Sequence, residues 1–355
     1  MNAIQAGDHE LRGANEAGTY PGATMKAATY RRFGGPEVVR IEEVPKPSPR
    51  RDEILIRVHA STLSAADHRA RSRTVPAGLQ VLTALALGVF RPRRRVLGMD
   101  VAGVVEATGS DVSKFGVGDE VVAMLGAKFG GHAEYVTVQQ DGPIAAKPRI
   151  MGFVEAVTLV FGGLPAQGFL ARADVEPGAT VLINGASGAV GTAAVQLAKH
   201  LGANVTAVCS GGNSALVTSL GADHVIDYTA EDFTAGGQTY DVIMDCVGNA
   251  PFSRVAASLS PGGALLLVIA DLRGMLQAPG NSRRTGKLVT AGDLKLNYTA
   301  EDLNALVRLA EDGHYKAIID RIYPLAEVVQ AHRFVDTGRK RGTVIVQVTG
   351  DSPIR

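Results

Sequence analysis

The most constraining feature of this sequence is a glycine-rich turn between a short apolar run and a helical pattern. The turn, residues 184–191, reads Asn-Gly-Ala-Ser-Gly-Ala-Val-Gly and follows the apolar run 180–183. Beyond it, apolar side chains recur at helical spacing from Val190 to Leu201, which indicates an amphipathic helix. A strand, a glycine turn and a helix in this order predict the first βαβ unit of a dinucleotide-binding domain.

The turn matches the pattern G-x-G-x-x-G with one substitution. Ala186 stands at the first glycine position, and Gly188 and Gly191 are in register. Gly188 would let the backbone approach a pyrophosphate closely, and Gly191 would let the helix pack against the strand. The helix N-terminus would direct free N–H groups and the positive end of its dipole at the phosphates. The predicted cofactor-binding residues are Ala186, Ser187, Gly188, Ala189, Val190 and Gly191. The alternative is a tight turn that binds nothing.

The two halves of the chain have different periodicities. The first half has strand composition at 54–59, 101–107, 120–124 and 132–138, and the eight glycines from Gly98 to Gly131 suit a small, strongly curved barrel. The second half alternates apolar strands with helices, which predicts a parallel sheet covered on both faces. Its further strands are predicted at 204–208, 224–226, 241–245 and 264–270, and its further helices at 214–220 and 252–259.

The expected organisation is a doubly wound domain inserted into a split outer domain, because the strand-like run 343–348 can rejoin the first domain. We predict a flexible N-terminal extension at 1–24 and a first domain at 25–150. A nucleotide-binding domain follows at 151–293, then a return to the first domain at 294–350 and a tail at 351–355.

The loop after the second predicted strand of the nucleotide-binding domain indicates which nicotinamide cofactor is used. An NAD site usually places Asp or Glu there to bind the ribose 2′-hydroxyl. This chain has no acid between Val208 and Asn213, and a carboxylate would repel a 2′-phosphate. Ser210 and Asn213 can instead donate hydrogen bonds to that phosphate. These two residues therefore favour NADPH, although a small-residue turn without such a role is the alternative.

Composition excludes several classes of protein. Lys and Arg number 36 against 35 Asp and Glu, so the formal net charge of +1 predicts neither nucleic-acid nor anionic-membrane binding. Two cysteines cannot build a four-cysteine zinc lobe or a disulfide framework, and they favour a reducing compartment such as the cytoplasm. The segment 1–24 lacks the pattern of a signal peptide. The apolar stretch 75–90 is shorter than the roughly 20 residues of a membrane-spanning helix.

Longer motifs surround the glycine turn. They are Phe-Gly-Gly-Pro-Glu at 33–37, Val-Leu-Gly-Met-Asp-Val-Ala-Gly-Val-Val at 96–105, Val-Gly-Asp-Glu-Val at 117–121, Leu-Gly-Ala-Asp-His-Val-Ile-Asp-Tyr at 220–228 and Ser-Pro-Gly-Gly at 260–263. On these motifs the chain resembles, from Met25 to Val348, the zinc-independent quinone oxidoreductases of the medium-chain dehydrogenase/reductase superfamily. The resemblance implies an α/β fold in which a GroES-like β-barrel catalytic domain carries an inserted Rossmann domain. It also implies a cleft between the domains and a homodimer.

The resemblance extends to individual cofactor and metal positions. It places Tyr228 near the 2′-phosphate or adenosine, and Val247, Gly248 and Asn249 in a turn that lines the cofactor. By the same resemblance, zinc-dependent relatives carry their ligands at positions that correspond here to Ser64, to the run 98–100 and to the apolar residues around Phe161. Cys209 and Cys246 do not fall at a ligand spacing. Since a catalytic zinc normally takes three protein ligands, no metal is expected.

The expected substrate is a small conjugated carbonyl compound. Without zinc, an isolated carbonyl lacks a group to polarise its oxygen, whereas conjugation in a quinone or an enone spreads the developing charge. In the segment that resembles the family's substrate side, the hydroxyl of Ser64 would bind the substrate oxygen and Asp67 would orient its neighbours. His68 would relay a proton, or it is a surface or ion-paired histidine. Arg69 stands where relatives often have Tyr.

Some alternatives remain open at this stage. Residues 75–90 would form an apolar wall of the cleft, a lid or part of the core. The basic run 91–95 would be a solvated loop, or it would bind nucleic acid or an acidic substrate. Residues 281–284 are expected in a loop that closes over the cofactor or moves freely. The leading hypothesis is an NADPH-dependent reductase of quinones or enones; a pathway-specific enoyl or carbonyl reductase and an NADPH-binding sensor or RNA-binding protein are the alternatives.

Overall fold

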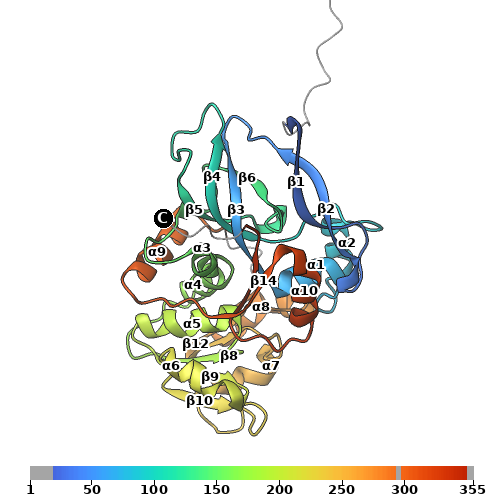
Figure 1. Cartoon of the computed structure of the whole chain (residues 1–355). Coiled ribbons are helices and arrows are strands. Elements are labelled where there is room, and N and C mark those ends of the chain that lie inside the picture. Colours follow the sequence, from blue (N-terminus) through green and yellow to red (C-terminus); the bar gives the residue numbers. More distant parts are fainter. Residues whose placement is uncertain (1–18, 293–296, 350–355) are drawn as a thin grey trace, which may run out of the picture.

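The computed structural model describes residues 19–292 and 297–349. Two sheets form the first domain, and Figure 1 shows them in the upper half of the molecule. A two-stranded sheet pairs β1 with β2, and a seven-stranded sheet has the order β14-β15-β3-β4-β5-β7, with β6 paired to β3. The strands are β1 (Thr19–Tyr30), β2 (Val39–Pro47), β3 (Glu53–Leu63), β4 (Asp100–Thr108), β5 (Glu120–Met124), β6 (Tyr135–Gln139), β7 (Ile144–Ala146), β14 (Ile319–Pro324) and β15 (Thr343–Gln347).

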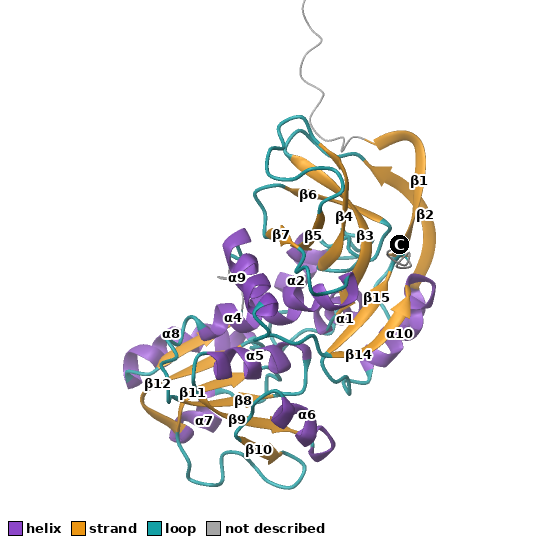
Figure 2. Cartoon of the chain, turned by 60° about the vertical axis from the view of Figure 1, so that its left-hand side comes forward, coloured by secondary structure: helices purple, strands orange, loops and turns teal. Residues whose placement is uncertain are grey.

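The second domain is a parallel sheet of six strands in the order β10-β9-β8-β11-β12-β13. This is the doubly wound Rossmann order, whose switch point lies between β8 and β11. Figure 2 shows the helices on both sides of this sheet. The elements are β8 (Thr180–Asn184), α5 (Ala189–His200), β9 (Asn204–Cys209), α6 (Ser214–Ser219), β10 (His224–Asp227), β11 (Tyr240–Asp245), α7 (Phe252–Val255), β12 (Leu259–Leu267), α8 (Leu272–Thr285) and β13 (Leu288–Ala291).

The chain returns to the first sheet after the Rossmann domain, because β15 pairs with β3 in antiparallel register from Val344↔Leu63 to Gln347↔Ala60. The predicted fold class, a GroES-like barrel with an inserted Rossmann domain, is confirmed. The remaining helices are α1 (Ala65–Ser72), α2 (Gln80–Leu87), α3 (Phe153–Ala156), α4 (Leu164–Leu170), α9 (Ala300–Glu311) and α10 (Val328–Asp336), with a π-helical turn at Leu159–Gly163.

Three sequence predictions about local structure are wrong. Residues 19–24 belong to β1, whereas the rest of the predicted extension and the predicted tail lie outside the described residues. Residues 281–284 lie in the last turns of α8, and a sixth strand, β13, follows at 288–291. Within the apolar stretch 75–90, α2 has no buried residue, so this helix is not part of the core, and only its Leu87 packs against the edge of a core cluster.

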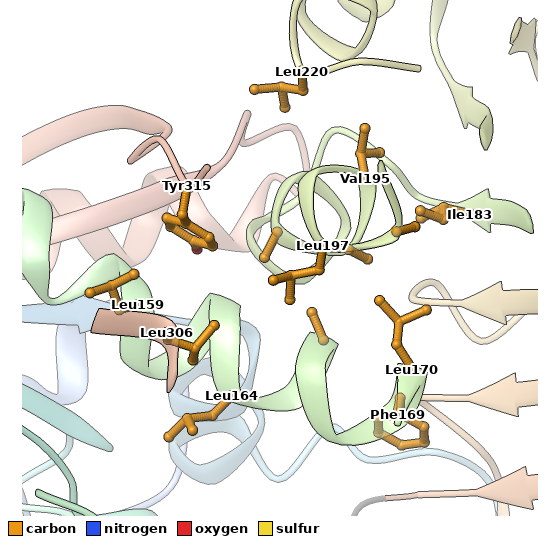
Figure 3. Packing of buried hydrophobic residues seen from close by; sticks show 14 of the residues in the cluster. Leu159, Leu164, Phe169, Leu170, Ile183, Val195, Leu197, Leu220, Leu306 and Tyr315 are labelled. Atoms are coloured by element: carbon orange, nitrogen blue, oxygen red, sulfur yellow. The ribbon is translucent and has the colours of Figure 1, made fainter. Parts of the chain in front are cut away.

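The main hydrophobic core joins the two domains. Figure 3 shows Leu164 of α4, Leu197 of α5 and Leu306 of α9 converging with Tyr315, and Ile183 of β8 belongs to the same buried cluster. The helical run Phe153–Leu170 is long and apolar enough to cross a membrane, but 67% of it is buried inside the protein. This run is therefore a core helix in this structure, and it fixes the barrel against the Rossmann sheet.

A fully buried carboxyl group ties the start of β4 to β3. Asp100 Oδ1 accepts a hydrogen bond from the Thr62 backbone N–H (2.7 Å), and its Oδ2 accepts one from the Thr62 hydroxyl (2.7 Å). The hydroxyl of Ser61 donates to the Asp100 carbonyl oxygen at 2.7 Å. Burial raises the pKa of Asp100 to about 7, against the lowering effect of the hydrogen bonds from Thr62. The neighbouring Met99 is thereby held at the cleft between the domains.

We predict that Asp100 makes the protein less stable as the pH rises. Its pKa is higher in the folded chain than the ordinary value of 3.8, so the folded state binds the proton more tightly and loses this advantage between about pH 4 and pH 7. Relative to the wild type, Asp100→Asn should gain about 2 to 4 kcal/mol of unfolding free energy from pH 4 to pH 8. Denaturant titrations at both pH values measure this gain.

The matched control is Asp141→Asn, at an exposed side chain. It should leave the difference between the two pH values unchanged. If Asp100→Asn shows the same pH dependence as the wild type, Asp100 does not bind its proton in this range.

Candidate functional site

A cavity of about 1040 Å³ lies between the barrel and the Rossmann domain. The glycine turn after β8 lines one side, and α1 together with Met99 and Met124 of the barrel lines the opposite side. Its wall is largely apolar, with a few polar groups that converge on it, as in binding sites for small molecules. Its polar lining residues include Arg69, Asn184, Ser187, Asn249 and Lys340.

The glycine turn has the geometry of a phosphate-binding loop. Gly185 has φ +80°, and a Cβ atom there would lie 2.7 Å from Val247 Cγ2. At Gly191 a Cβ atom would lie 2.1 Å from the Gly185 carbonyl oxygen, so only glycine lets the first turn of α5 approach the strand. Gly188 is the N-cap of α5 and faces the cavity, and the next N–H groups have no acceptor within the helix. These groups are available to a diphosphate.

The structure brings most of the predicted turn residues to the cavity and adds one glycine. Ser187, Gly188, Ala189, Val190 and Gly191 line it. Ala186 is fully buried beneath the turn. The left-handed conformation belongs to Gly185, which the alignment to G-x-G-x-x-G did not count. The dipeptide Asn-Gly after an apolar strand is the signal for such a backbone position.

The turn after β11 is built on Asp245, a buried residue that sequence reasoning missed. Its carboxylate accepts hydrogen bonds from the backbone N–H groups of Val247 (3.0 Å), Gly248 (3.1 Å) and Ala250 (2.9 Å). It also accepts one from the Asn184 side chain at 2.9 Å. Asp245 therefore fixes the turn at 247–249 beside the glycine turn, and Val247 and Asn249 line the cavity.

The loop after β9 is placed beside the glycine turn by Asn213. Its side-chain amide donates to the hydroxyls of Ser187 and Ser210, both at 3.1 Å. Tyr228 lines the cavity, whereas Ser210 and Asn213 do not. An acid does reach this loop, but from the neighbouring strand: a Cβ atom on Gly211 would lie 2.4 Å from Asp227 Oδ2. Hydrogen bonds from the side chain and backbone of Thr229 lower the pKa of Asp227, so it is ionised.

Ser64 and Asp67 form the N-terminal cap of α1. The Ser64 hydroxyl donates to Asp67 Oδ2 at 2.6 Å and accepts from the Ala66 and Asp67 N–H groups at 3.2 and 3.3 Å. Asp67 Oδ1 accepts from the Gly98 N–H at 2.8 Å. Both side chains are buried, and neither lines the cavity. These contacts give both residues a positioning function at the start of α1.

The other face of α1 is fixed to α10 by an ion-paired cluster. Arg71, fully buried, donates to both carboxylate oxygens of Asp336 at 2.6 Å and to the Gly34 carbonyl oxygen at 2.7 Å. His68 Nδ1 lies 2.6 Å from Asp336 Oδ1. His68 thus contacts a carboxylate of α10 and does not line the cavity, and its function as a proton relay stays a prediction. Burial, then the charges of His132 and Arg71, lower the pKa of His332 well below its ordinary value, and its ring accepts from Arg71 Nε at 3.3 Å.

Three cations line the cavity, and sequence reasoning assigned a function to none of them. Arg254 pairs with Asp232 at 3.1 Å, which leaves Arg69 and Lys340. Arg69 points there from α1 with Ala65 and Ala66, and its side chain forms no ion pair or hydrogen bond with the residues that the structure describes. Burial lowers the pKa of this guanidinium. Lys340 lies beside the glycine turn, because the Gly342 N–H donates to the Ser187 carbonyl oxygen at 2.7 Å. Burial lowers the pKa of Lys340 to about 8, against the attraction of Asp320.

The positions expected for zinc ligands hold other groups. Ser64 caps α1, whereas Met99 and Phe161 line the cavity with a thioether and a phenyl ring. Within residues 19–292 and 297–349, no group of three or more His, Cys, Asp or Glu side chains is arranged to hold a metal ion. Cys209 and Cys246 are free thiols in the Rossmann domain.

Comparisons with known proteins agree with this architecture. Residues 50–149 match the alcohol dehydrogenase GroES-like domain, and residues 220–346 match the zinc-binding dehydrogenase family. A chloroplastic quinone oxidoreductase of Triphysaria versicolor is 33% identical over 342 residues, which cover 92% of this chain and 99% of that protein. An NADPH-dependent alkenal/one oxidoreductase of Arabidopsis thaliana is 31% identical over 91% of this chain and 79% of its own.

A solved structure has the same fold. The quinone oxidoreductase from Coxiella burnetii superposes with a TM-score of 0.82 at 30% sequence identity, over 92% of this chain and all of that one. With these relatives, the chain is an oxidoreductase and belongs to the medium-chain dehydrogenase/reductase superfamily, as a quinone oxidoreductase-like member.

Proposed function

We propose that this protein transfers a hydride from NADPH to a quinone or an α,β-unsaturated carbonyl compound, without zinc. The observation that carries the proposal is the cavity between the domains, in which a phosphate-binding turn lies opposite the guanidinium of Arg69. Relatives named quinone oxidoreductase and alkenal/one oxidoreductase support the substrate class.

The cofactor would lie across the switch point of the Rossmann sheet. The N–H groups at the start of α5 would bind its diphosphate, and Lys340 would neutralise part of that charge. Ser210, Asn213 and Tyr228 would hold the adenosine end. When bound, the nicotinamide would supply the hydride. Val247, Val268 and Ile269 would orient the ring and keep water from it, because they line the cavity with apolar side chains.

Arg69 is the group best placed to assist the reaction. A half-buried guanidinium without an acidic partner favours an oxygen that carries negative charge. As the hydride reaches the conjugated carbon of the substrate, charge moves to the carbonyl oxygen, and Arg69 would hold that oxygen by hydrogen bonds. The proton that completes the reduction would come from solvent. Ser64 and Asp67 would act through α1, by positioning Arg69.

The donor set argues for a reaction without zinc. A tetrahedral catalytic zinc site needs three ligands such as imidazole, thiolate or carboxylate. The thioether of Met99 and the ring of Phe161 do not provide them, and the Ser64 hydroxyl is bound to Asp67. An isolated ketone would therefore have only Arg69 to polarise it. A quinone or an enone also stabilises the charge within its own π-system, which favours these acceptors.

Location in the cytoplasm and a homodimer remain predictions. The free thiols of Cys209 and Cys246 are consistent with a reducing compartment. The edge strand β13 would offer a second subunit a row of hydrogen-bonding groups.

The reductase proposal predicts which acceptors oxidise NADPH. Benzoquinones and cyclic enones should be reduced at least about tenfold faster than saturated ketones of the same size, because conjugation lowers the barrier by more than about 1.4 kcal/mol. Loss of absorbance of the reduced nicotinamide measures each rate. Failure of every quinone and enone in the panel would contradict the proposal, and so would a rate that depends on added zinc.

The NADPH preference predicts the effect of one substitution in the loop after β9. Ser210→Asp places a carboxylate beside the 2′-phosphate, so kcat/KM for NADPH should fall about tenfold or more while the value for NADH holds or rises. The matched control is Ser219→Asp, at an exposed position of α6. A wild-type enzyme that prefers NADH would overturn the assignment, and the carboxylate of Asp227 would be its cause.

The proposed function of Arg69 predicts a loss of kcat. Arg69→Gln should lower kcat about 100-fold, since it removes a charge aimed at the developing oxyanion. Arg69→Lys should retain part of the wild-type kcat. The control Arg333→Gln, at an exposed side chain, should have the same kcat as the wild type. Steady-state kinetics at saturating NADPH test this. If only KM for NADPH rises, Arg69 binds the cofactor and does not assist hydride transfer.

A further inference from the structure

The helix α2 exposes an apolar face that the fold leaves uncovered. Its sequence, Gln-Val-Leu-Thr-Ala-Leu-Ala-Leu, contains no charged residue. The exposed fractions are 71% for Val81, 57% for Leu82, 55% for Leu85 and 90% for Phe90, which follows the helix. An apolar helix of a globular protein is normally buried, and contiguous exposed apolar side chains mark an interaction site.

The uncovered face is one side of the helix. Residues 81, 82 and 85 fall within about 100° of the helix circumference, at about 100° per residue. Leu87, on the opposite side, packs against the cluster of the first domain that contains Leu97 and Leu325. Figure 1 shows α2 at the edge of the molecule beside α1 and β2. No residue of α2 lines the cofactor cavity, so the face serves neither the core nor the catalytic cavity.

A dense group of arginines adjoins this face. Arg91, Arg93, Arg94 and Arg95 are exposed, and their side chains form no ion pair or hydrogen bond within the described part of the chain. A second cavity, of about 510 Å³, begins at Phe90. Its other lining residues include Arg31, Arg32, Arg40, Arg91 and Arg95, with Glu37 and Glu42. Arg31 pairs with Glu42 at 3.0 Å, so the group keeps an excess of positive charge.

We propose that α2, Val89, Phe90 and the arginines 91–95 form a docking surface for a bilayer that contains anionic phospholipids. The apolar side chains would enter the boundary between headgroups and acyl chains, and the arginines would bind lipid phosphates. The cavity beginning at Phe90 would hold one headgroup. This proposal departs from the expectation based on the net charge of +1, because the arginines are gathered directly after one helix.

Charge complementarity favours a membrane over the other occupants of such a face. In a twofold dimer the surface would meet its own copy and bring arginines against arginines. A nucleic acid would satisfy the arginines but not four exposed apolar side chains beside them. An anionic bilayer satisfies both parts of the surface.

The chain contains no tryptophan, so one substitution supplies a specific reporter. In Leu85→Trp, emission should shift to the blue on mixing with vesicles of phosphatidylcholine and phosphatidylglycerol, and much less with phosphatidylcholine alone. The control Val117→Trp, at a position 69% exposed on the barrel, should not shift. The measurement needs neither cofactor nor turnover, so its outcome is independent of the proposed function.

Vesicle flotation of the full chain tests which groups bind. The double variant Leu82→Glu and Leu85→Glu, and the variant with Gln at Arg91, Arg93, Arg94 and Arg95, should each lower the bound fraction about tenfold or more. The control Arg283→Gln with Arg284→Gln, at exposed positions of α8, should bind as the wild type does. Quinone reduction in solution should be unchanged in every variant, which also shows that each is folded.

Three results would overturn the proposal. Wild-type protein that does not float with anionic vesicles has no such surface. A change from dimer to monomer in Leu82→Glu with Leu85→Glu, without vesicle binding by the wild type, would assign the face to a second copy. Retention on nucleic acid that the arginine substitutions abolish, again without vesicle binding, would assign the arginines to a nucleic acid.

Discussion

Helix α5 can follow β8 after the short turn 185–188 only because two glycines leave room for its first turn. A side chain at Gly191 would collide with the Gly185 carbonyl oxygen, and one at Gly185 would collide with Val247. This close approach aims the free N–H groups of α5 into the cavity. Asn184, the register partner of Asp245 in the adjacent strand, donates to the carboxylate that fixes the second turn of the site. The two turns of the cofactor cavity therefore meet where β8 and β11 end side by side, and a side chain at Gly185 would collide with the second turn at Val247.

The barrel side of the cavity is held by buried polar groups rather than by its own sheet. Asp67 caps α1 and binds the Gly98 N–H, and Arg71 fixes the same helix to Asp336 of α10. Asp100 fixes the start of β4 one residue after Met99. Removing one partner of such a buried pair leaves the other unsatisfied, so these contacts hold α1 in one orientation. That orientation carries Arg69 into the cavity, opposite the glycine turn.

The periodicity of apolar residues in the sequence predicted those helices and strands that bury side chains at regular spacing. The strand 120–124 has the same bounds in the structure, and the helix after the glycine turn begins one residue before its predicted stripe. What the pattern could not show is which strands end side by side. Asp227 of the neighbouring strand reaches the loop after β9. Asp245 fixes the turn at 247–249 by accepting hydrogen bonds from its backbone N–H groups. The apolar composition of 75–90 indicated a helix, but composition does not say whether the fold covers it.

The connection between β3 and β4 carries the residues on which both proposals rest. These strands are antiparallel neighbours, and such a pair needs only a two-residue turn, yet the whole stretch 64–99 lies between them. It contributes no strand to the sheet, but Asp67 joins its two ends at Gly98, and Arg71 and Leu97 tie it to the rest of the first domain. Its first part, α1, brings Arg69 to the cavity, and its second part, α2, carries an uncovered apolar face. The proposed catalytic cation and the proposed docking surface thus lie in one connection, and the two sheets hold that connection in place.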